Sequence, residues 1–150
     1  MRVDVVPLVG IGPIRLGMTR DQVRAAVDMP PLSFRKGAEV DAFYNNALQV
    51  FYAADCPMAE FVEVSLGSEL EPWLDGLDLS RVPADEVVAS LSKAATVDDR
   101  DPELGLSYVF PALGISLWRR TLPESAADLE GRYFDTVGVG AAGYFGGRRG

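Results

Sequence analysis

A near match to the phosphate-binding pattern G-x-x-x-x-G-K-[ST] occurs in the segment GPIRLGMT, residues 12–19. In that pattern the lysine contacts the β- and γ-phosphates, and backbone N–H groups cradle them after a parallel strand. Here Met18 stands in place of the lysine and Pro13 removes one N–H donor. The preceding residues 3–7 are also weak evidence for a parallel strand. We therefore interpret the segment as the entry to a helix, not as a nucleotide site.

Histidine is absent from all 150 residues, which excludes the commonest catalytic centres. Ser-His-Asp and Cys-His pairs, His-ligated zinc and a histidine general base all require it. The single thiol, Cys56, has no histidine to activate it, so we expect it to be inert. The acidic run at residues 98–103 lacks the glycine and the final glutamate of a calcium loop, which favours a solvated loop. The sequence thus predicts no catalytic residue, no cofactor and no metal ion.

The charge of the chain is strongly acidic, with 22 Asp and Glu against 14 Lys and Arg and a net charge of -8. Such a charge repels nucleic acids and anionic membranes, so we expect neither as a partner. Between Ala54 and Gly105 thirteen acidic residues face only three basic ones, which favours a partner with a basic surface. No apolar run is long enough for a membrane span, and residues 1–7 resemble no signal peptide. A lone cysteine forms no internal disulfide, and we expect a cytoplasmic protein.

The first half of the chain is predicted to contain a helix and three strands. Thr19 and Gln22 have the spacing of a capping box, and the prolines at 30 and 31 end the helix that follows. Residues 41–52 are typical of two strands joined by a tight turn at Asn45 and Asn46, and residues 61–66 form a third strand.

The second half repeats this order. A helix is predicted at residues 83–91, a hairpin at 107–118 and a last strand at 134–140. These segments follow their counterparts by 64, 67 and 73 residues, as loop insertions in a duplicated unit would produce. We predict one domain built from two pseudo-repeats, about 8–70 and 76–140, with a glycine-rich tail at 141–150. The expected fold class is α+β: two tandem helix-β-β-β units forming one antiparallel sheet, with helices on one face and an open, concave opposite face.

Alternation along the strands assigns their side chains to the two faces. Leu48, Val50, Ile115 and Leu117 are predicted to face the helices. The open face then carries aromatic and small polar groups, a mixture closer to an interface than to plain solvated surface. These residues are Gln49, Phe51, Glu63, Ser65, Ser116, Trp118 and Thr136.

The pattern I-x-L-G-M-T-x-x-x-V, from Ile14 to Val23, resembles the helix entry of domains related to β-lactamase inhibitory protein and to the small outer-membrane assembly lipoproteins. The pattern covers about ten residues, and the tandem order of elements extends the resemblance to most of the chain. It implies a cupped sheet whose concave face and hairpin tips grip another protein. This chain lacks the disulfides and signal peptide of the secreted inhibitor and the lipid-bearing cysteine of the lipoproteins. No individual binding residue is carried across.

Together these observations favour a non-enzymatic protein that binds and inhibits another protein, most concretely a bacterial immunity-type protein that neutralises a toxin or enzyme. The predicted binding residues are Tyr44, Asn45, Phe51, Phe110 and Trp118. One alternative is a small-molecule-binding domain, or an enzyme that uses carboxylates in the sheet cup. Another is an assembly module that forms a homodimer through the same face.

Overall fold

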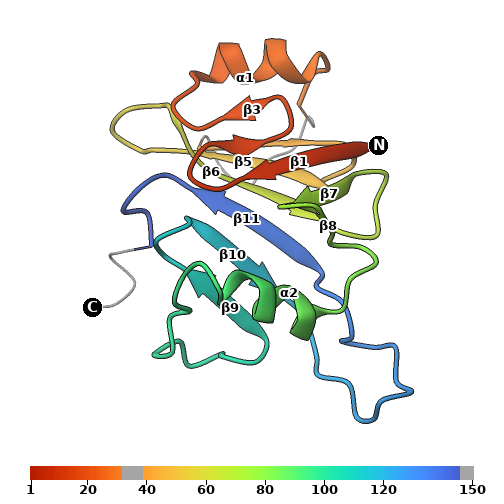
Figure 1. The fold of residues 1–150 in the computed structure, drawn as a ribbon. Coiled ribbons are helices and arrows are strands. Elements are labelled where there is room, and N and C mark those ends of the chain that lie inside the picture. The colour runs from red at the N-terminus through yellow and green to blue at the C-terminus, as the bar shows by residue number, and fades with distance from the viewer. Residues whose placement is uncertain (32–38, 146–150) are drawn as a thin grey trace.

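Two β-sheets and two short helices form the fold in the computed structural model, which describes residues 1–31 and 39–145 (Figure 1). The first sheet has five strands in the order β3-β2-β1-β7-β8. The second has six strands in the order β4-β5-β6-β11-β10-β9. The strands of the first sheet are β1 (Arg2–Val6), β2 (Gly10–Ile11), β3 (Ile14–Arg15), β7 (Glu71–Leu74) and β8 (Leu77–Asp78). Those of the second are β4 (Val40–Phe43), β5 (Leu48–Tyr52), β6 (Ala59–Ser65), β9 (Ser107–Phe110), β10 (Ile115–Trp118) and β11 (Thr136–Gly140).

The α+β class is confirmed, but the prediction of a single antiparallel sheet was wrong. Strand β1 pairs in parallel with β7, and both belong to the five-stranded sheet. Val3, Val5 and Leu74 turn their side chains into the core from this sheet. Their burial stabilises β1 and β7 as strands although the sequence of these segments gave only a weak strand prediction. The two strands belong to a separate sheet that packs on the six-stranded sheet.

Helix α1 (Arg20–Val27) begins at the capping box that its sequence predicts. The backbone N–H of Gln22 donates to Thr19 Oγ1 at 3.3 Å, and the Thr19 N–H donates to Gln22 Oε1 at 2.9 Å. The helix ends before the prolines, because Asp28 adopts the left-handed conformation. The strand directly before residues 12–19, β2, pairs antiparallel with both β1 and β3, so this segment does not follow a parallel strand as a phosphate loop does.

The six-stranded sheet shows the same pairing in its two halves. Asp41 lies opposite Val50 in β4 and β5, and Tyr108 lies opposite Leu117 in β9 and β10. Tyr108 follows Asp41 by 67 residues and Leu117 follows Val50 by the same number, which is the shift that the sequence predicts for the two hairpins. The third strands correspond with a shift of 75 residues rather than the 73 predicted, since Leu48 pairs with Val64 and Ile115 with Val139. The common pairing fits a duplicated unit, which stays a prediction.

The centre of this internal symmetry lies where β6 and β11 pair antiparallel. Glu63 lies opposite Gly138, its own counterpart under the 75-residue shift. Val62 lies opposite Val139 and Val64 opposite Val137 on either side of it. A pseudo-twofold axis therefore passes through the sheet between Glu63 and Gly138.

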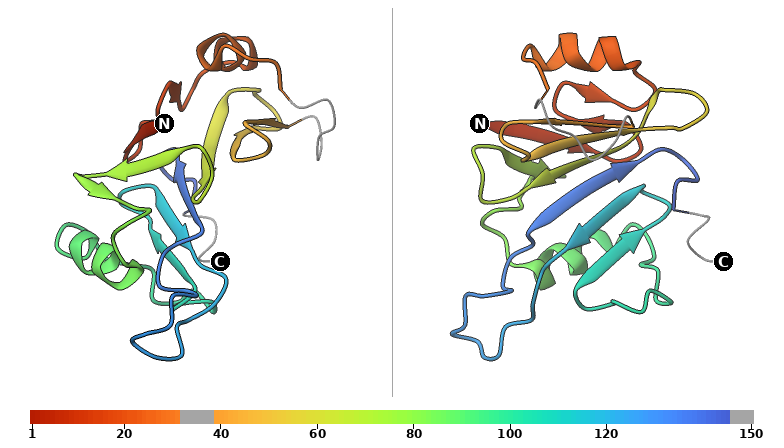
Figure 2. Two further views of the ribbon diagram at one scale, coloured as in Figure 1. Left: turned by 90° about the vertical axis from the view of Figure 1, so that its right-hand side faces the viewer. Right: turned by 180° about the vertical axis from the view of Figure 1, so that it is seen from behind.

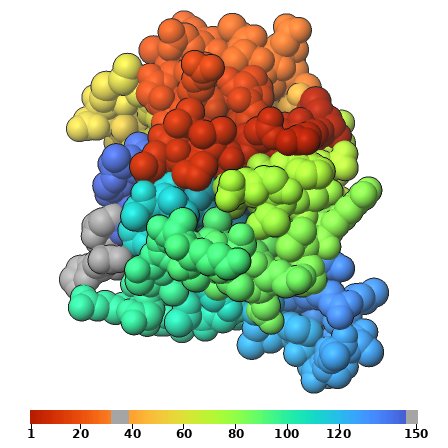
Figure 3. Space-filling view, viewed as in Figure 1, coloured from red at the N-terminus to blue at the C-terminus, as the bar shows by residue number. Residues whose placement is uncertain are grey.

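One face of the six-stranded sheet packs against the rest of the protein. Its inward residues join a core to which α1, the five-stranded sheet and α2 (Ala84–Leu91) all contribute. The N-terminal strands, β7, β8 and α2 cover this side, and the segment between β10 and β11 projects beyond it (Figure 3). Seen from behind, β9, β10 and β11 lie in front of α2 (Figure 2, right). Leu48, Val50, Ile115 and Leu117 are all buried on the core side, as alternation predicts.

Neither helix in the described parts of the chain is long and apolar enough to cross a membrane.

Candidate functional site

The other face of the six-stranded sheet, which we call the outer face, carries a cluster of aromatic rings. Phe51 on β5 lies 5.5 Å from Phe61 on β6, measured between ring centroids. Tyr144 stacks on Phe61 at 5.0 Å with an interplanar angle of 6°. Phe145 meets Phe61 edge-on at 6.0 Å and is 3% exposed. Offset and edge-on arrangements of this kind stabilise aromatic pairs beyond the area that they bury.

Two glycines of β11 make room for these rings. A Cβ atom at Gly138 would overlap the tip of the Phe61 ring, and one at Gly140 would contact the Tyr144 ring. Beyond β11, the N–H of Ala141 donates to Glu60 O at 3.0 Å. The first residues of the predicted glycine-rich tail thus dock on the sheet as far as Phe145, and residues 146–150 lie outside the described residues.

A hollow of about 420 Å³ lies beside this aromatic cluster on the outer face. Trp118 at the end of β10 is 39% exposed and forms part of its wall. The carboxylates of Glu63 and Glu103 also line the hollow, and no basic side chain occurs among the described residues that line it. Hydroxyl groups and the aromatic cluster complete the lining. The full set is Phe61, Glu63, Glu103, Ser107, Ser116, Leu117, Trp118, Thr136, Tyr144 and Phe145.

The predicted binding residues fall into three different environments. Phe51 and Trp118 both lie on the outer face, at positions related by the pseudo-twofold axis. Tyr44 and Asn45 lie in the turn between β4 and β5, where their φ angles are 51° and 54°. Asn45 is exposed and Tyr44 is half-buried against the core. The turn was predicted at Asn45 and Asn46, and the structure extends its left-handed conformation to Tyr44.

The prediction of Phe110 as a binding residue was wrong. Its side chain is 0% exposed and belongs to the main core. Phe110 lies directly opposite Ile115, and residues opposite each other in an antiparallel pair point to the same face. Because Ile115 faces the core, Phe110 must face it too. Its neighbour Val109 occupies the outer face, under the ring cluster.

Sequence reasoning missed several residues of the outer face. Phe61 precedes Glu63 by two positions and therefore points the same way, a signal that alternation contains. Glu103 and the pair Tyr144–Phe145 lie in loops, where no periodicity places a side chain. Only the docking of these loops brings them to the hollow.

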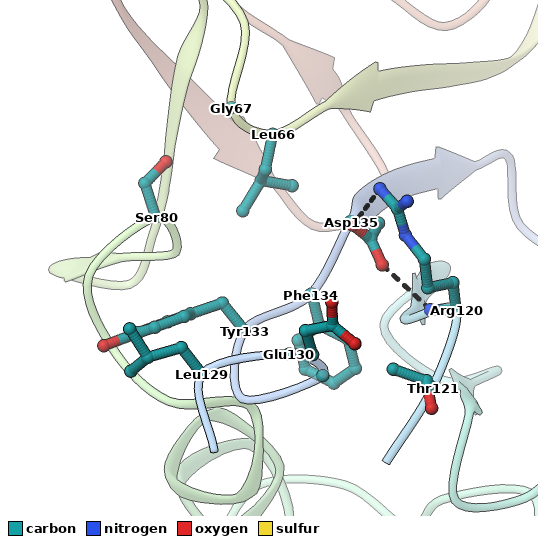
Figure 4. Close-up of a pocket in the computed structure, with 11 residues that line it drawn as sticks. Leu66, Gly67, Ser80, Arg120, Thr121, Leu129, Glu130, Tyr133, Phe134 and Asp135 are labelled. Carbon is teal, nitrogen blue, oxygen red and sulfur yellow. Dashed lines mark hydrogen bonds and ion pairs between the residues drawn. The ribbon is translucent and has the colours of Figure 1, made fainter. Parts of the chain in front are cut away.

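A second cavity of about 460 Å³ lies between the end of β6 and the segment that joins β10 to β11 (Figure 4). Arg120 and Asp135 face each other at its edge: the Arg120 N–H donates to Asp135 Oδ2 at 2.8 Å, and Arg120 Nη2 donates to Oδ1 at 3.4 Å. Leu66, Leu129 and Tyr133 also line this cavity. Two of the charged side chains that line this cavity thus pair with each other, and Glu130 is a third charge in the lining.

A buried ion cluster attaches α1 to the first half of the sheet. Asp41 is 0% exposed and accepts hydrogen bonds from Nε and Nη2 of Arg24, both at 3.0 Å. The hydroxyl of Tyr52 also donates to Asp41 at 3.0 Å, and Arg20 Nη1 lies 3.6 Å away. Burial alone would raise the pKa of Asp41, but the hydrogen bonds from Arg24 and Tyr52 outweigh it and lower the pKa below 3.8. Burial, reinforced by Asp41, raises the pKa of Tyr52 well above 10.

The second half has a polar cluster at the corresponding places. Arg119, which follows Tyr52 by 67 residues, is 3% exposed and donates to Gly105 O at 2.9 Å and Gly131 O at 3.0 Å. It also donates to Asp85 on α2 at 3.2 Å. Each half therefore ties its helix to its strands with an arginine and a carboxylate. We assign these clusters to the framework that shapes the sheet, because they lie away from the outer face.

No group of three or more acidic or cysteine side chains that could hold a metal ion occurs in residues 1–31 and 39–145. In the acidic run at 98–103, Asp98 Oδ1 and Asp101 Oδ1 accept hydrogen bonds from nearby backbone N–H groups. Among the described residues, the other carboxylate oxygen of Asp101, Oδ2, is buried without a hydrogen-bond partner, so the predicted solvated loop is partly buried.

Comparison of the chain with family models, curated proteins and solved structures found no match.

Proposed function

We propose that this chain is a non-enzymatic protein that binds another protein through the outer face of its six-stranded sheet and inhibits it. The observation that carries the proposal is Trp118, a large aromatic side chain left 39% exposed beside a hollow and next to a ring cluster. Tryptophan and tyrosine are enriched among the residues that dominate binding energy at interfaces. We include in this proposal two features predicted from the sequence, namely that the binding face is open and concave and that the chain consists of two tandem units.

Charge indicates what kind of protein would bind. The hollow presents Glu103, and the whole chain has a net charge of -8. A partner with a basic surface would be steered toward this face and would gain speed of association at low salt. An immunity-type protein, acting on a toxin with a basic substrate cleft, is the most concrete form of the proposal. The resemblance of the helix entry to β-lactamase inhibitory protein supports the same class of function.

The test is affinity capture with three forms of the full chain, followed by titration of any captured protein after purification. The wild type is compared with Phe51→Ala/Trp118→Ala and with Val9→Ala/Leu122→Ala, which removes exposed apolar side chains elsewhere. We expect the partner to bind the wild type and the control and to lose at least tenfold in affinity for the outer-face variant. Equal affinity for all three forms would refute the outer face as the binding surface.

Inhibition needs its own measurement. In the immunity form of the proposal, co-expression of the chain protects cells from the partner's toxicity, and the outer-face variant protects less. Protection that is identical with both variants contradicts inhibition through this face.

The alternative of a small-molecule-binding domain, or an enzyme using carboxylates, has the cavity at Arg120 and Asp135 in its favour. A thermal-shift screen separates the two, because a small ligand that binds only the folded state stabilises the purified protein by RT ln(1 + [L]/Kd). The homodimeric assembly module predicts a doubled mass by light scattering, which the Phe51→Ala/Trp118→Ala variant would lose.

A further inference from the structure

The cavity between the end of β6 and the segment that joins β10 to β11 has the lining of a small-molecule site (Figure 4). We propose that it binds a free α-amino acid with a large apolar side chain. The carboxylate of the amino acid pairs with Arg120, its ammonium group pairs with Asp135, and its side chain lies against Leu66 and Leu129. This inference goes beyond the proposed function, because no described residue lines both this cavity and the hollow on the outer face.

Two opposite charges lie side by side at the edge of the cavity. Arg120 Nη2 lies 3.4 Å from Asp135 Oδ1, which is longer than a strong charge-assisted hydrogen bond. The guanidinium makes no other hydrogen bond to the described residues and its side chain is 76% exposed, so most of its N–H donors are open to a ligand. An α-amino acid likewise carries its two charges on groups bonded to one carbon. Its carboxylate can therefore meet Arg120 while its ammonium group meets Asp135, whose oxygens retain free lone pairs.

A second carboxylate, that of Glu130, lines the same cavity. This carboxylate accepts no hydrogen bond from the described residues, whereas the backbone N–H of Glu130 donates to Asp128 Oδ1 at 3.0 Å. The described lining therefore presents two carboxylates and one guanidinium. This excess of negative charge favours a ligand that carries an ammonium group over one that carries only a carboxylate.

Apolar side chains form another part of the wall. Leu66 lies directly after β6, and Leu129, Tyr133 and Phe134 belong to the segment that joins β10 to β11. Leu129 is 67% exposed, so a ligand that covers it removes apolar surface from water. The volume of about 460 Å³ lies within the range of ligand pockets. An amino acid with a large apolar side chain therefore gains more from this cavity than one with a small side chain.

The segment at 119–135 is braced by hydrogen bonds. Arg132 Nη2 donates to Ala126 O at 2.8 Å within the segment, and the N–H of Ala84 on α2 donates to Arg132 O at 2.7 Å. The connection at the corresponding place of the first half, at 53–58, is much shorter. The second half thus has a longer segment that forms most of the cavity wall. A wall that is already in place costs a ligand little ordering entropy.

The probe is L-leucine, titrated into the isotope-labelled full chain while the backbone amide signals are followed by NMR. We expect saturable shifts of the signals of Arg120, Glu130 and Asp135, and the signals of α1 serve as the internal control. Leucinamide lacks the carboxylate and should bind about threefold more weakly, because a pair between exposed charges contributes modestly. Isocaproate lacks the ammonium group and also faces the two carboxylates, so it should bind about tenfold more weakly. Glycine keeps both charges but lacks the side chain, and it should bind about tenfold more weakly.

A variant combined with two ligands tests the pairing itself. Arg120→Gln should weaken leucine about threefold and should not weaken leucinamide, which has no carboxylate to lose. Arg15→Gln, an exposed change of the same charge outside the cavity, should leave both affinities unchanged. Equal losses for leucine and leucinamide, an equal loss in Arg15→Gln, glycine that binds as tightly as leucine, or no saturable shift would overturn the inference.

The inference and the proposed function fail independently. If leucine binds and a purified partner loses affinity for Phe51→Ala/Trp118→Ala, the chain carries both sites on separate surfaces. If leucine binds and the partner ignores that variant, the amino-acid site stands and the outer face is not the partner's binding surface. If the partner depends on the outer face and leucine shifts no signal, the amino-acid site is wrong and the proposed function is unaffected.

Discussion

Replacing Asp41 with asparagine tests how the first half of the sheet is held together. Asp41→Asn keeps the size and shape of the side chain and removes its charge. In the native protein this carboxylate is 0% exposed and accepts hydrogen bonds from Arg24 and Tyr52, with Arg20 nearby. The variant leaves two arginines facing a neutral amide, one of whose two polar atoms is a donor that neither arginine can use.

The magnitude follows from the exposure of the arginines. Removing one partner of a buried ion pair typically costs about 3–5 kcal/mol. The side chains of Arg24 and Arg20 are 34% and 25% exposed and can regain part of their hydration. We therefore expect the free energy of unfolding at pH 7 to fall by about 3 kcal/mol, at the lower end of this range. For a chain of this length that loss corresponds to a decrease in Tm of about 6–12 °C.

The loss should depend on pH in a defined direction. The folded-state pKa of Asp41 lies below its ordinary value of 3.8, so protonation disfavours the folded state. The contribution of the Asp41 charge to the free energy of unfolding is complete above pH 3.8 and is lost as the pH falls through the folded-state pKa. A protonated Asp41 resembles asparagine. The difference in stability between wild type and Asp41→Asn should therefore shrink as the pH is lowered below 3.8.

Urea unfolding followed by tryptophan fluorescence at a series of pH values from 7 to 3 measures this difference. Asp99→Asn, an exposed change of the same charge, is the control and should change stability by less than about 0.5 kcal/mol. A difference at pH 7 below about 1 kcal/mol, or one that stays constant down to pH 3, would refute the assignment of the ion cluster as the attachment of α1.

Three further outcomes follow from the structure. Because burial raises the pKa of Tyr52, the neutral phenol contributes to the free energy of unfolding fully below pH 10, and this contribution is lost as the pH rises above 10. Tyr52→Phe should abolish this alkaline loss of stability, as measured by urea titrations. Gly138→Ala should cost about 1–3 kcal/mol because the new methyl group overlaps Phe61, and much less in a Phe61→Ala background, as a double-mutant cycle would show. Phe110→Ala should destabilise by about 3–5 kcal/mol and Trp118→Ala by much less, measured by differential scanning calorimetry.

The local parts of the fold were predictable from particular residues. Thr19 and Gln22 marked the start of α1, because a capping box satisfies specific backbone groups. Alternation in the two hairpins placed Leu48 and Ile115 on the core side. The same rule, applied to the strand pairs, would have placed Phe110 in the core and Phe61 on the outer face. These two errors came from incomplete use of a local signal.

The remaining features depend on contacts between distant segments. The parallel pairing of β1 with β7 joins residues about 70 positions apart, and no local pattern in either strand reveals which strand is its partner. Glu103 and Tyr144 reach the hollow from loops, so their positions follow from docking and not from propensity. Gly138 contains no side chain from which its role could be inferred. Its importance appears only when the Phe61 ring is seen above it.

The position of the pseudo-twofold axis has a consequence for what the two halves can encode. In a dimer of two identical halves, the residue on the axis would meet its own copy, and a glutamate there would face a glutamate. Within a single chain the two positions are separate codons, and here one is Glu63 and the other Gly138. That freedom lets one half supply a charge while the other leaves, at the same point, the space that the Phe61 ring occupies. The resulting asymmetry seats the aromatic cluster around Phe61 at the centre of the sheet.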